Sequence, residues 1–65
     1  MPRFIVRYKP RGTPENYPLS AMIVHGADRD HAKQRWKENM DSRTYIYVTV
    51  GSVPDTFDAS EMIEI

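Results

Sequence analysis

A proline-rich stretch early in the chain is the feature that most restricts its fold. Residues 10–18 hold three prolines and one glycine in nine positions. Proline lacks the backbone N–H that a helix interior or a central strand needs. Neither a helix nor a strand can therefore run through this stretch, and we expect a long, partly stiffened loop.

The segments on either side of this loop have the two-residue periodicity of β-strands. Phe4, Val6 and Tyr8 alternate with Ile5 and charged residues over positions 3–9, which predicts a half-buried strand. Residues 19–25 form a second apolar run that ends at Gly26. We expect these two strands to pair antiparallel.

Helix-forming residues follow, because β-branched residues are missing from positions 27–40. Asp28 is the predicted N-cap, since its carboxylate can accept from a free amide of the first turn. Ala32, Trp36 and Met40 lie four residues apart and form one narrow apolar stripe. We expect the helix to lie against one face of a sheet.

Residues 44–50 consist only of Thr, Tyr, Ile and Val, which favour strands. Regular alternation would turn Ile46, Val48 and Val50 toward the helix and leave Tyr45 and Tyr47 on the opposite, uncovered face. We expect this strand to lie at the centre of the sheet. If it neighboured the second strand, the two would be parallel, with a right-handed crossover.

The rest of the chain is less regular. Gly51 and Pro54 are expected to end the third strand, and residues 53–60 to return Phe57 to the core. Residues 61–65 fit either a short edge strand or a frayed tail. The expected fold is a single α+β domain over residues 1–65, with a small three- to four-stranded sheet and one helix packed on one face (ββαβ, with an optional C-terminal edge strand).

Charge is distributed unevenly along a chain whose formal net charge is zero. The first eleven residues carry +4 and the last thirteen carry −4. If the two ends are neighbouring strands, opposite charges pair across the sheet. If they lie apart, a basic face and an acidic face remain that could steer a charged partner. The residues concerned are Arg3, Arg7, Lys9 and Arg11, and Asp55, Asp58, Glu61 and Glu64.

Size and the absence of cysteine exclude several classes of protein. A chain of 65 residues without Cys has a small core and cannot use disulfides, cysteine-bound zinc or thiol catalysis. Self-association would be a further source of burial. No apolar run approaches the length of a membrane helix, so we expect a soluble cytoplasmic protein in a reducing compartment, without membrane contact.

Catalytic and metal-binding patterns are weak. His25 and His31 flank two aspartates, but a contact within the first helical turn accounts for His31 without a metal. Ser20 and His25 are five residues apart on a strand and would lie on opposite faces. No phosphate loop or zinc-protease motif occurs. We therefore expect no enzyme activity, no catalytic residue, no cofactor and no metal.

Two surfaces are candidates for binding. Exposed Tyr45 and Tyr47, together with Arg3 and Arg7, are residue types enriched at protein interfaces, although tyrosines also tolerate water on an open sheet. Unpaired sheet edges could also bind a partner strand or a second copy. The alternative is nucleic-acid contact through Arg3, Arg7, Lys9 and Arg11.

The nucleic-acid alternative has two weaknesses. The aromatic residues of the first strand lie on the opposite pleat from its cations, whereas single-strand binders combine the two. The sequence pI of 6.7 is below the value of about 9 that is usual for such domains. An ordinary solvated strand face is the other interpretation of these cations.

The order of elements, with the helix that opens at Ala27-Asp28-Arg29-Asp30-His31-Ala32-Lys33, resembles that of small phage-encoded proteins. These include phage inhibitors of bacterial RNA polymerase and some anti-CRISPR proteins. Residues 3–40 are also similar to the N-terminal half of HicB-type antitoxins, whose usual continuation is missing here. The resemblance lies in element order and the capped helix, so no binding residues are carried over. It implies a compact, cofactor-free protein that occupies a surface of a larger host machine.

These observations lead to three hypotheses. The first is a non-enzymatic interaction protein of phage or mobile-element type, which binds and inhibits or modulates a larger protein or nucleoprotein complex in the host cytoplasm. The second is a nucleic-acid-binding module that uses the basic N-terminal strand. The third is a self-assembling structural component, which would form a homo-oligomer.

Overall fold

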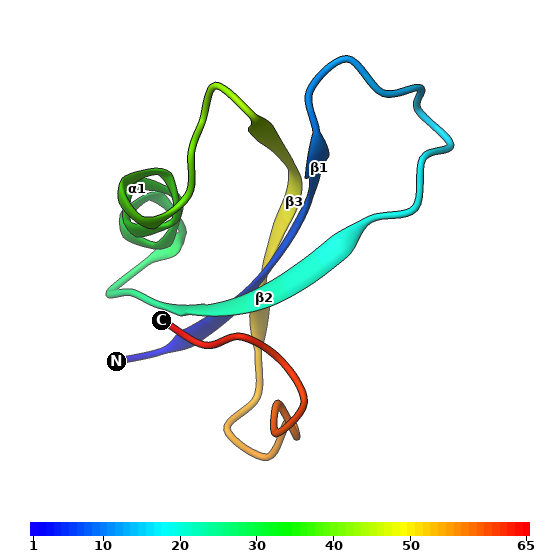
Figure 1. Cartoon of the computed structure of the whole chain (residues 1–65). Helices are drawn as coiled ribbons and strands as arrows, with labels where there is room; N and C mark the ends of the chain where they lie inside the picture. The colour runs from blue at the N-terminus through cyan, green and yellow to red at the C-terminus, as the bar shows by residue number, and fades with distance from the viewer.

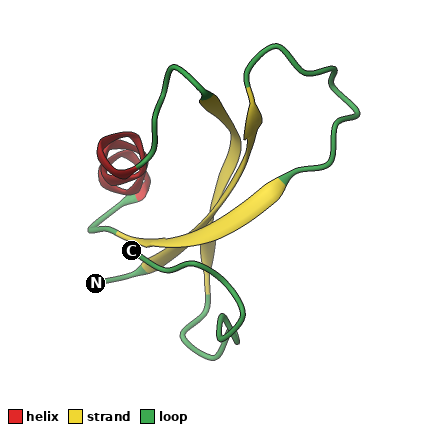
Figure 2. Cartoon of the chain, in the orientation of Figure 1, coloured by secondary structure: helices red, strands yellow, loops and turns green.

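The computed structural model describes all 65 residues, as a three-stranded sheet with one helix on one face (Figure 1). The elements are β1 (Arg3–Pro10), β2 (Ser20–His25), α1 (Arg29–Asn39) and β3 (Tyr45–Val53). The proline-rich stretch is a long loop that joins β1 to β2 (Figure 2). The predicted small α+β fold and the antiparallel pairing of the first two strands are confirmed.

β1 is the central strand, because the strand order is β2-β1-β3 and both neighbours are antiparallel to it. The prediction that residues 44–50 form the central strand was therefore wrong. β1 is apolar on both faces: Val6 is buried on the helix side and Ile5 on the other. A strand that must bury both faces is most stable between two neighbours. β2 and β3 do not touch as strands, so no parallel crossover forms.

Helix α1 forms as its sequence predicts. The Asp28 carboxylate accepts a hydrogen bond of 2.8 Å from the backbone N–H of His31, which caps the first turn. The His31 ring in turn accepts from the backbone N–H of Ala27. Ala32 and Trp36 are fully buried against the sheet and Met40 packs beside them. The main core is thus one layer between α1 and the sheet, and it comprises Phe4, Val6, Tyr8, Met22, Val24, Ala32 and Trp36.

A β-bulge changes which side chains of β3 face the helix. Tyr8 pairs with Tyr47 and Arg7 pairs with Thr49, so Val48 is an extra residue on β3. An extra residue shifts the alternation of faces. Tyr45, Tyr47 and Val50 all pack toward α1, whereas Ile46 and Val48 are exposed. The prediction was right for Val50, but it was wrong to place Tyr45 and Tyr47 on the uncovered face.

The C-terminal segment covers part of the face opposite α1. Ile5, Ile23 and Ala59 form a second small core there, and Phe57 packs against it as expected. Glu64 and Ile23 form a parallel bridge, and the last residues lie alongside β2 (Figure 1). The tail is therefore a short paired edge segment, and it lies beside β2 and not beside the basic strand β1.

Candidate interaction surface

The structure places the four residues predicted to bind a protein partner in three different regions. Arg3 belongs to the contact between β1 and the C-terminal segment, Arg7 lies on the open part of the sheet face opposite α1, and Tyr45 and Tyr47 lie beside the helix. They do not form one surface.

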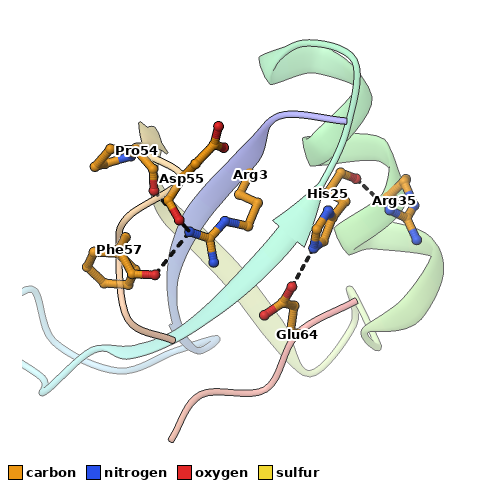
Figure 3. A network of polar contacts seen from close by, with 7 residues as sticks. All are labelled: Arg3, His25, Arg35, Pro54, Asp55, Phe57 and Glu64. Atoms are coloured by element: carbon orange, nitrogen blue, oxygen red, sulfur yellow. Dashed lines mark hydrogen bonds and ion pairs between the residues drawn. The ribbon is translucent and has the colours of Figure 1, made fainter. Parts of the chain in front are cut away.

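Arg3 has a structural role. One of its terminal nitrogens, Nη2, donates to the carbonyl oxygens of Pro54 (3.0 Å), Asp55 (2.8 Å) and Phe57 (3.0 Å). Figure 3 shows the guanidinium inside the turn that these residues form. Its charge therefore meets main-chain carbonyls, and no ion pair joins it to an acidic side chain of the C-terminal segment.

Two other cations of the basic segment are also engaged. The Lys9 ammonium donates to the carbonyl oxygens of Thr13 and Pro14, at 3.2 and 3.1 Å. The Arg11 Nε donates to the Ser42 carbonyl at 2.6 Å. The side chain of Arg7 is exposed, and it is the only one of the four that makes no hydrogen bond. Three of the four predicted cations therefore donate to main-chain carbonyls.

A hollow of about 330 Å³ brings Tyr45, Tyr47 and Arg11 together between α1 and β3. We call it the aromatic hollow. Tyr45 and Tyr47, which the sequence predicted as binding residues, belong to β3. Arg11 lies in the loop that follows β1. Seven residues line it: Arg11, Trp36, Lys37, Ser42, Tyr45, Ile46 and Tyr47.

The aromatic rings that form this hollow pack edge to face. Tyr47 meets Trp36 with centroids 5.7 Å apart and planes at 87°, and Tyr45 meets Tyr8 at 5.7 Å and 85°. Such tilted contacts are the preferred geometry of aromatic pairs. The rings therefore hold one another, and Tyr45 and Tyr47 remain only half-buried at the surface.

Two lysines of α1 lie close to the ring of Tyr47. The ammonium groups of Lys33 and Lys37 each lie 5.7 Å from the centroid of the Tyr47 ring, within cation–π range. No acidic residue lines the hollow. The nearby carboxylate of Asp41 already has hydrogen-bond partners on both oxygens. The backbone N–H of Arg43 donates to one and the hydroxyl of Thr44 to the other, and these bonds, the first more than the second, lower the pKa of Asp41.

One residue of the lining, Trp36, carries a buried donor without a partner. Trp36 is almost completely buried, and its indole N–H has no acceptor in the protein. Buried polar groups without a partner are rare in folded proteins and costly. Arg11 and Lys37, the two cations of the lining, lie in the same hollow. The two cations of the lining suit a group that carries negative charge.

Sequence reasoning did not identify the helix residues Trp36, Lys33 and Lys37 as neighbours of a hollow. The helical periodicity predicts that Trp36 belongs to the core, as the structure confirms, and that Lys33 and Lys37 face water. Their spacing held a signal, because residues 33, 36 and 37 lie on adjacent positions of one helical surface. A tryptophan flanked in this way by two lysines indicates a basic rim around an aromatic residue.

Two further surface features are less distinctive. The first is a set of exposed large apolar residues, which includes Leu19, Ile46 and Val48. Ile46 pairs with Lys9 across the sheet, and Val48 is the bulge residue beside the pair of Thr49 and Arg7. A shallower hollow of about 700 Å³ lies where the N-terminus meets the end of β3, between Met1 and Asp55. Only two of its seven lining residues are hydrophobic, and Arg3 within it is already bound to carbonyls.

The histidines and Ser20 do not assemble a catalytic group. His25 contacts Glu64 at 2.5 Å (Figure 3), His31 belongs to the helix cap, and Ser20 and His25 pair with opposite ends of β1. No group of three metal-ligating side chains comes together. The single helix of the chain is neither long enough nor apolar enough to cross a membrane.

Comparisons with protein families, with curated proteins and with solved structures found no match for this chain. The resemblance to small phage-encoded proteins therefore stays a prediction from element order, and the aromatic hollow has to be interpreted from its own chemistry.

Proposed function

We propose that this chain is a non-enzymatic interaction protein that binds an acidic segment of a larger protein in the aromatic hollow and thereby modulates that protein. The class is the one that the phage resemblance implies, acting in the host cytoplasm. The observation that carries the proposal is the lining of the aromatic hollow, which includes two cations, Arg11 and Lys37, and no acidic residue.

The hollow has the composition of a protein-binding hot spot. Tryptophan, tyrosine and arginine dominate such sites, and they act best where a rigid pocket excludes water. A carboxylate of the partner would meet the two cations of the lining, Arg11 and Lys37, and charge-assisted hydrogen bonds of this kind are the stronger ones. The hollow should therefore favour partners with a negatively charged segment.

Partner capture with a matched pair of variants tests the proposal. Lys37→Glu reverses one charge in the hollow, and Arg29→Glu makes the same change at the other end of α1, outside the hollow. We expect tagged wild type and Arg29→Glu to retain one protein partner from nuclease-treated lysate. Lys37→Glu should bind at least about tenfold more weakly, since buried charge contacts at interfaces cost 2 kcal/mol or more to disrupt.

Trp36 supplies a direct readout, because it is the only tryptophan. Titration of the captured partner should change its fluorescence in wild type and in Arg29→Glu at the same concentrations. Equal weakening by both variants would argue against the hollow. Loss of the partner on nuclease treatment would instead favour the nucleic-acid alternative.

A further inference from the structure

The outer edge of β3 is unpaired along its whole length. β3 bonds to β1 on one side, and no segment pairs with its other side. The outer edge of β2 is different, because the C-terminal tail bonds to it: the N–H of Ile23 donates to Ile63 at 2.8 Å and that of Ile65 donates to Ile23 at 2.9 Å. Backbone groups of β3 are therefore available for another strand.

The open edge has little of the protection that edges usually carry. Proteins block exposed edges with lysines, prolines or bulges. Residues 44–54 contain no charged residue, and no proline occurs within β3. Only the bulge at Val48 interrupts the strand. An edge of nine residues, rich in Tyr, Ile and Val, is well suited to strand addition.

The two ends of this uncharged strand carry opposite charge. Arg43 precedes β3 with a side chain that is 95% exposed, and Arg11 and Lys37 lie in the hollow beside its first residues. Asp55 and Asp58 follow its last residue. Asp41 lies at the basic end, but Arg43 and Thr44 hold its carboxylate.

We propose that β3 pairs antiparallel with β3 of a second copy of this chain. Antiparallel pairing brings the basic start of each strand to the acidic end of the other, whereas parallel pairing would align like charges. A register centred on Thr49 overlaps all nine residues. It also brings Arg43 opposite Asp55 of the second copy, because these residues lie six positions before and six after Thr49. The contact occurs twice in the pair.

This pairing gives a closed, two-fold symmetric dimer with one continuous six-stranded sheet. The symmetry axis runs perpendicular to the sheet at Thr49, so both α1 helices and both aromatic hollows lie on the same face. The dimer also offsets a weakness of the monomer, since only 11 of its 65 residues are buried. The inference uses the edge of β3 and does not rest on the proposed binding function.

Sedimentation equilibrium over a range of concentrations tests the dimer directly. Wild type should show a reversible monomer–dimer equilibrium. Thr49→Glu brings two carboxylates together at the symmetry axis and should raise the dissociation constant at least about threefold, because like charges directly opposite each other are unfavourable. In the monomer the new carboxylate lies beside Arg7, its cross-strand partner, so the fold is retained. Thr49→Gln is the neutral control and should dimerise like wild type.

Charge exchange tests the register. Arg43→Glu and Asp55→Arg should each raise the dissociation constant about tenfold, since each replaces two attractive contacts with two repulsive ones. The double variant restores both opposite-charge contacts and should recover most of the wild-type affinity. A wild type that stays monomeric up to about 1 mM, a free energy near −4 kcal/mol, would overturn the proposal. So would a double variant no better than the single ones.

Discussion

Gly26 determines how closely α1 approaches the sheet. It is buried where β2 turns into the helix, and its N–H donates to the Pro2 carbonyl at 3.1 Å. A Cβ added there would lie 2.8 Å from the backbone nitrogen of Ala32 and 3.0 Å from its Cα. The sequence predicted only that the strand ends at this glycine. Its contact with a residue six positions later depends on the path of the chain.

We therefore expect Gly26→Ala to destabilise the protein by about 1–3 kcal/mol, because the atoms in its way are backbone atoms that cannot move aside. Gly51→Ala is the matched control, since nothing lies within 4 Å of an added Cβ there and its φ is not in the left-handed region. Urea unfolding followed by Trp36 fluorescence measures both. Equal losses of stability would show that the close approach at Ala32 is unimportant.

The helix and β3 show which elements a sequence can specify. For α1, the cap at Asp28 and the stripe of Ala32 and Trp36 are local patterns, and the structure follows them. For β3, the strand itself was predictable, but which of its side chains point toward α1 was not. Facing depends on the bulge at Val48, which forms through the pairing with β1. Tyr45 and Tyr47 were therefore identified as binding residues for a face that they do not occupy.

The turn that leads into β3 should respond to acid. The Arg43 amide, and then the Thr44 hydroxyl, hold the pKa of Asp41 below its ordinary value of 3.8. A lowered folded-state pKa means that the stabilising contribution is present above pH 3.8 and is lost as the pH falls through the folded-state pKa. We expect Asp41→Asn to be less stable than wild type at pH 7, with a difference that shrinks on acidification.

Urea unfolding at several pH values from neutral to strongly acidic measures this difference. Glu15→Gln is the control, because the Glu15 carboxylate lies exposed in the long loop and accepts no hydrogen bond. Its stability relative to wild type should change less with pH. A difference between Asp41→Asn and wild type that stayed constant down to the lowest pH would contradict the assignment.

The candidate site combines residues that only the whole fold brings together. Arg11 and Trp36 are far apart in the sequence, and they meet because β1 and β3 pair while α1 packs across them. Charge patterns were equally hard to interpret along the chain. The basic and acidic ends were expected either to pair across neighbouring strands or to remain apart. In the structure the acidic tail lies beside β2, and Arg3 binds carbonyl oxygens instead of carboxylates.

Arg3 therefore joins the first strand to the segment that closes the second core. Its guanidinium holds the carbonyls of Pro54, Asp55 and Phe57, and this turn leads to Ala59, which covers Ile5 and Ile23. Arg3→Ala should cost about 1–2 kcal/mol, because hydrogen bonds to a charged donor are lost and the carbonyls must find water. The loss of stability should be concentrated in the C-terminal segment.

Hydrogen exchange can locate that loss. The amides of Phe57 and Met62, which donate to Pro54 and Ala59, should exchange faster in Arg3→Ala, while amides of β2 that pair with β1 keep most of their protection. Arg7→Ala is the matched control on the same strand, since that side chain is exposed and makes no hydrogen bond. If both variants left the Phe57 amide equally protected, the hydrophobic contacts of Ala59 and Phe57 alone would hold the segment in place, and Arg3 would be dispensable for closing the second core.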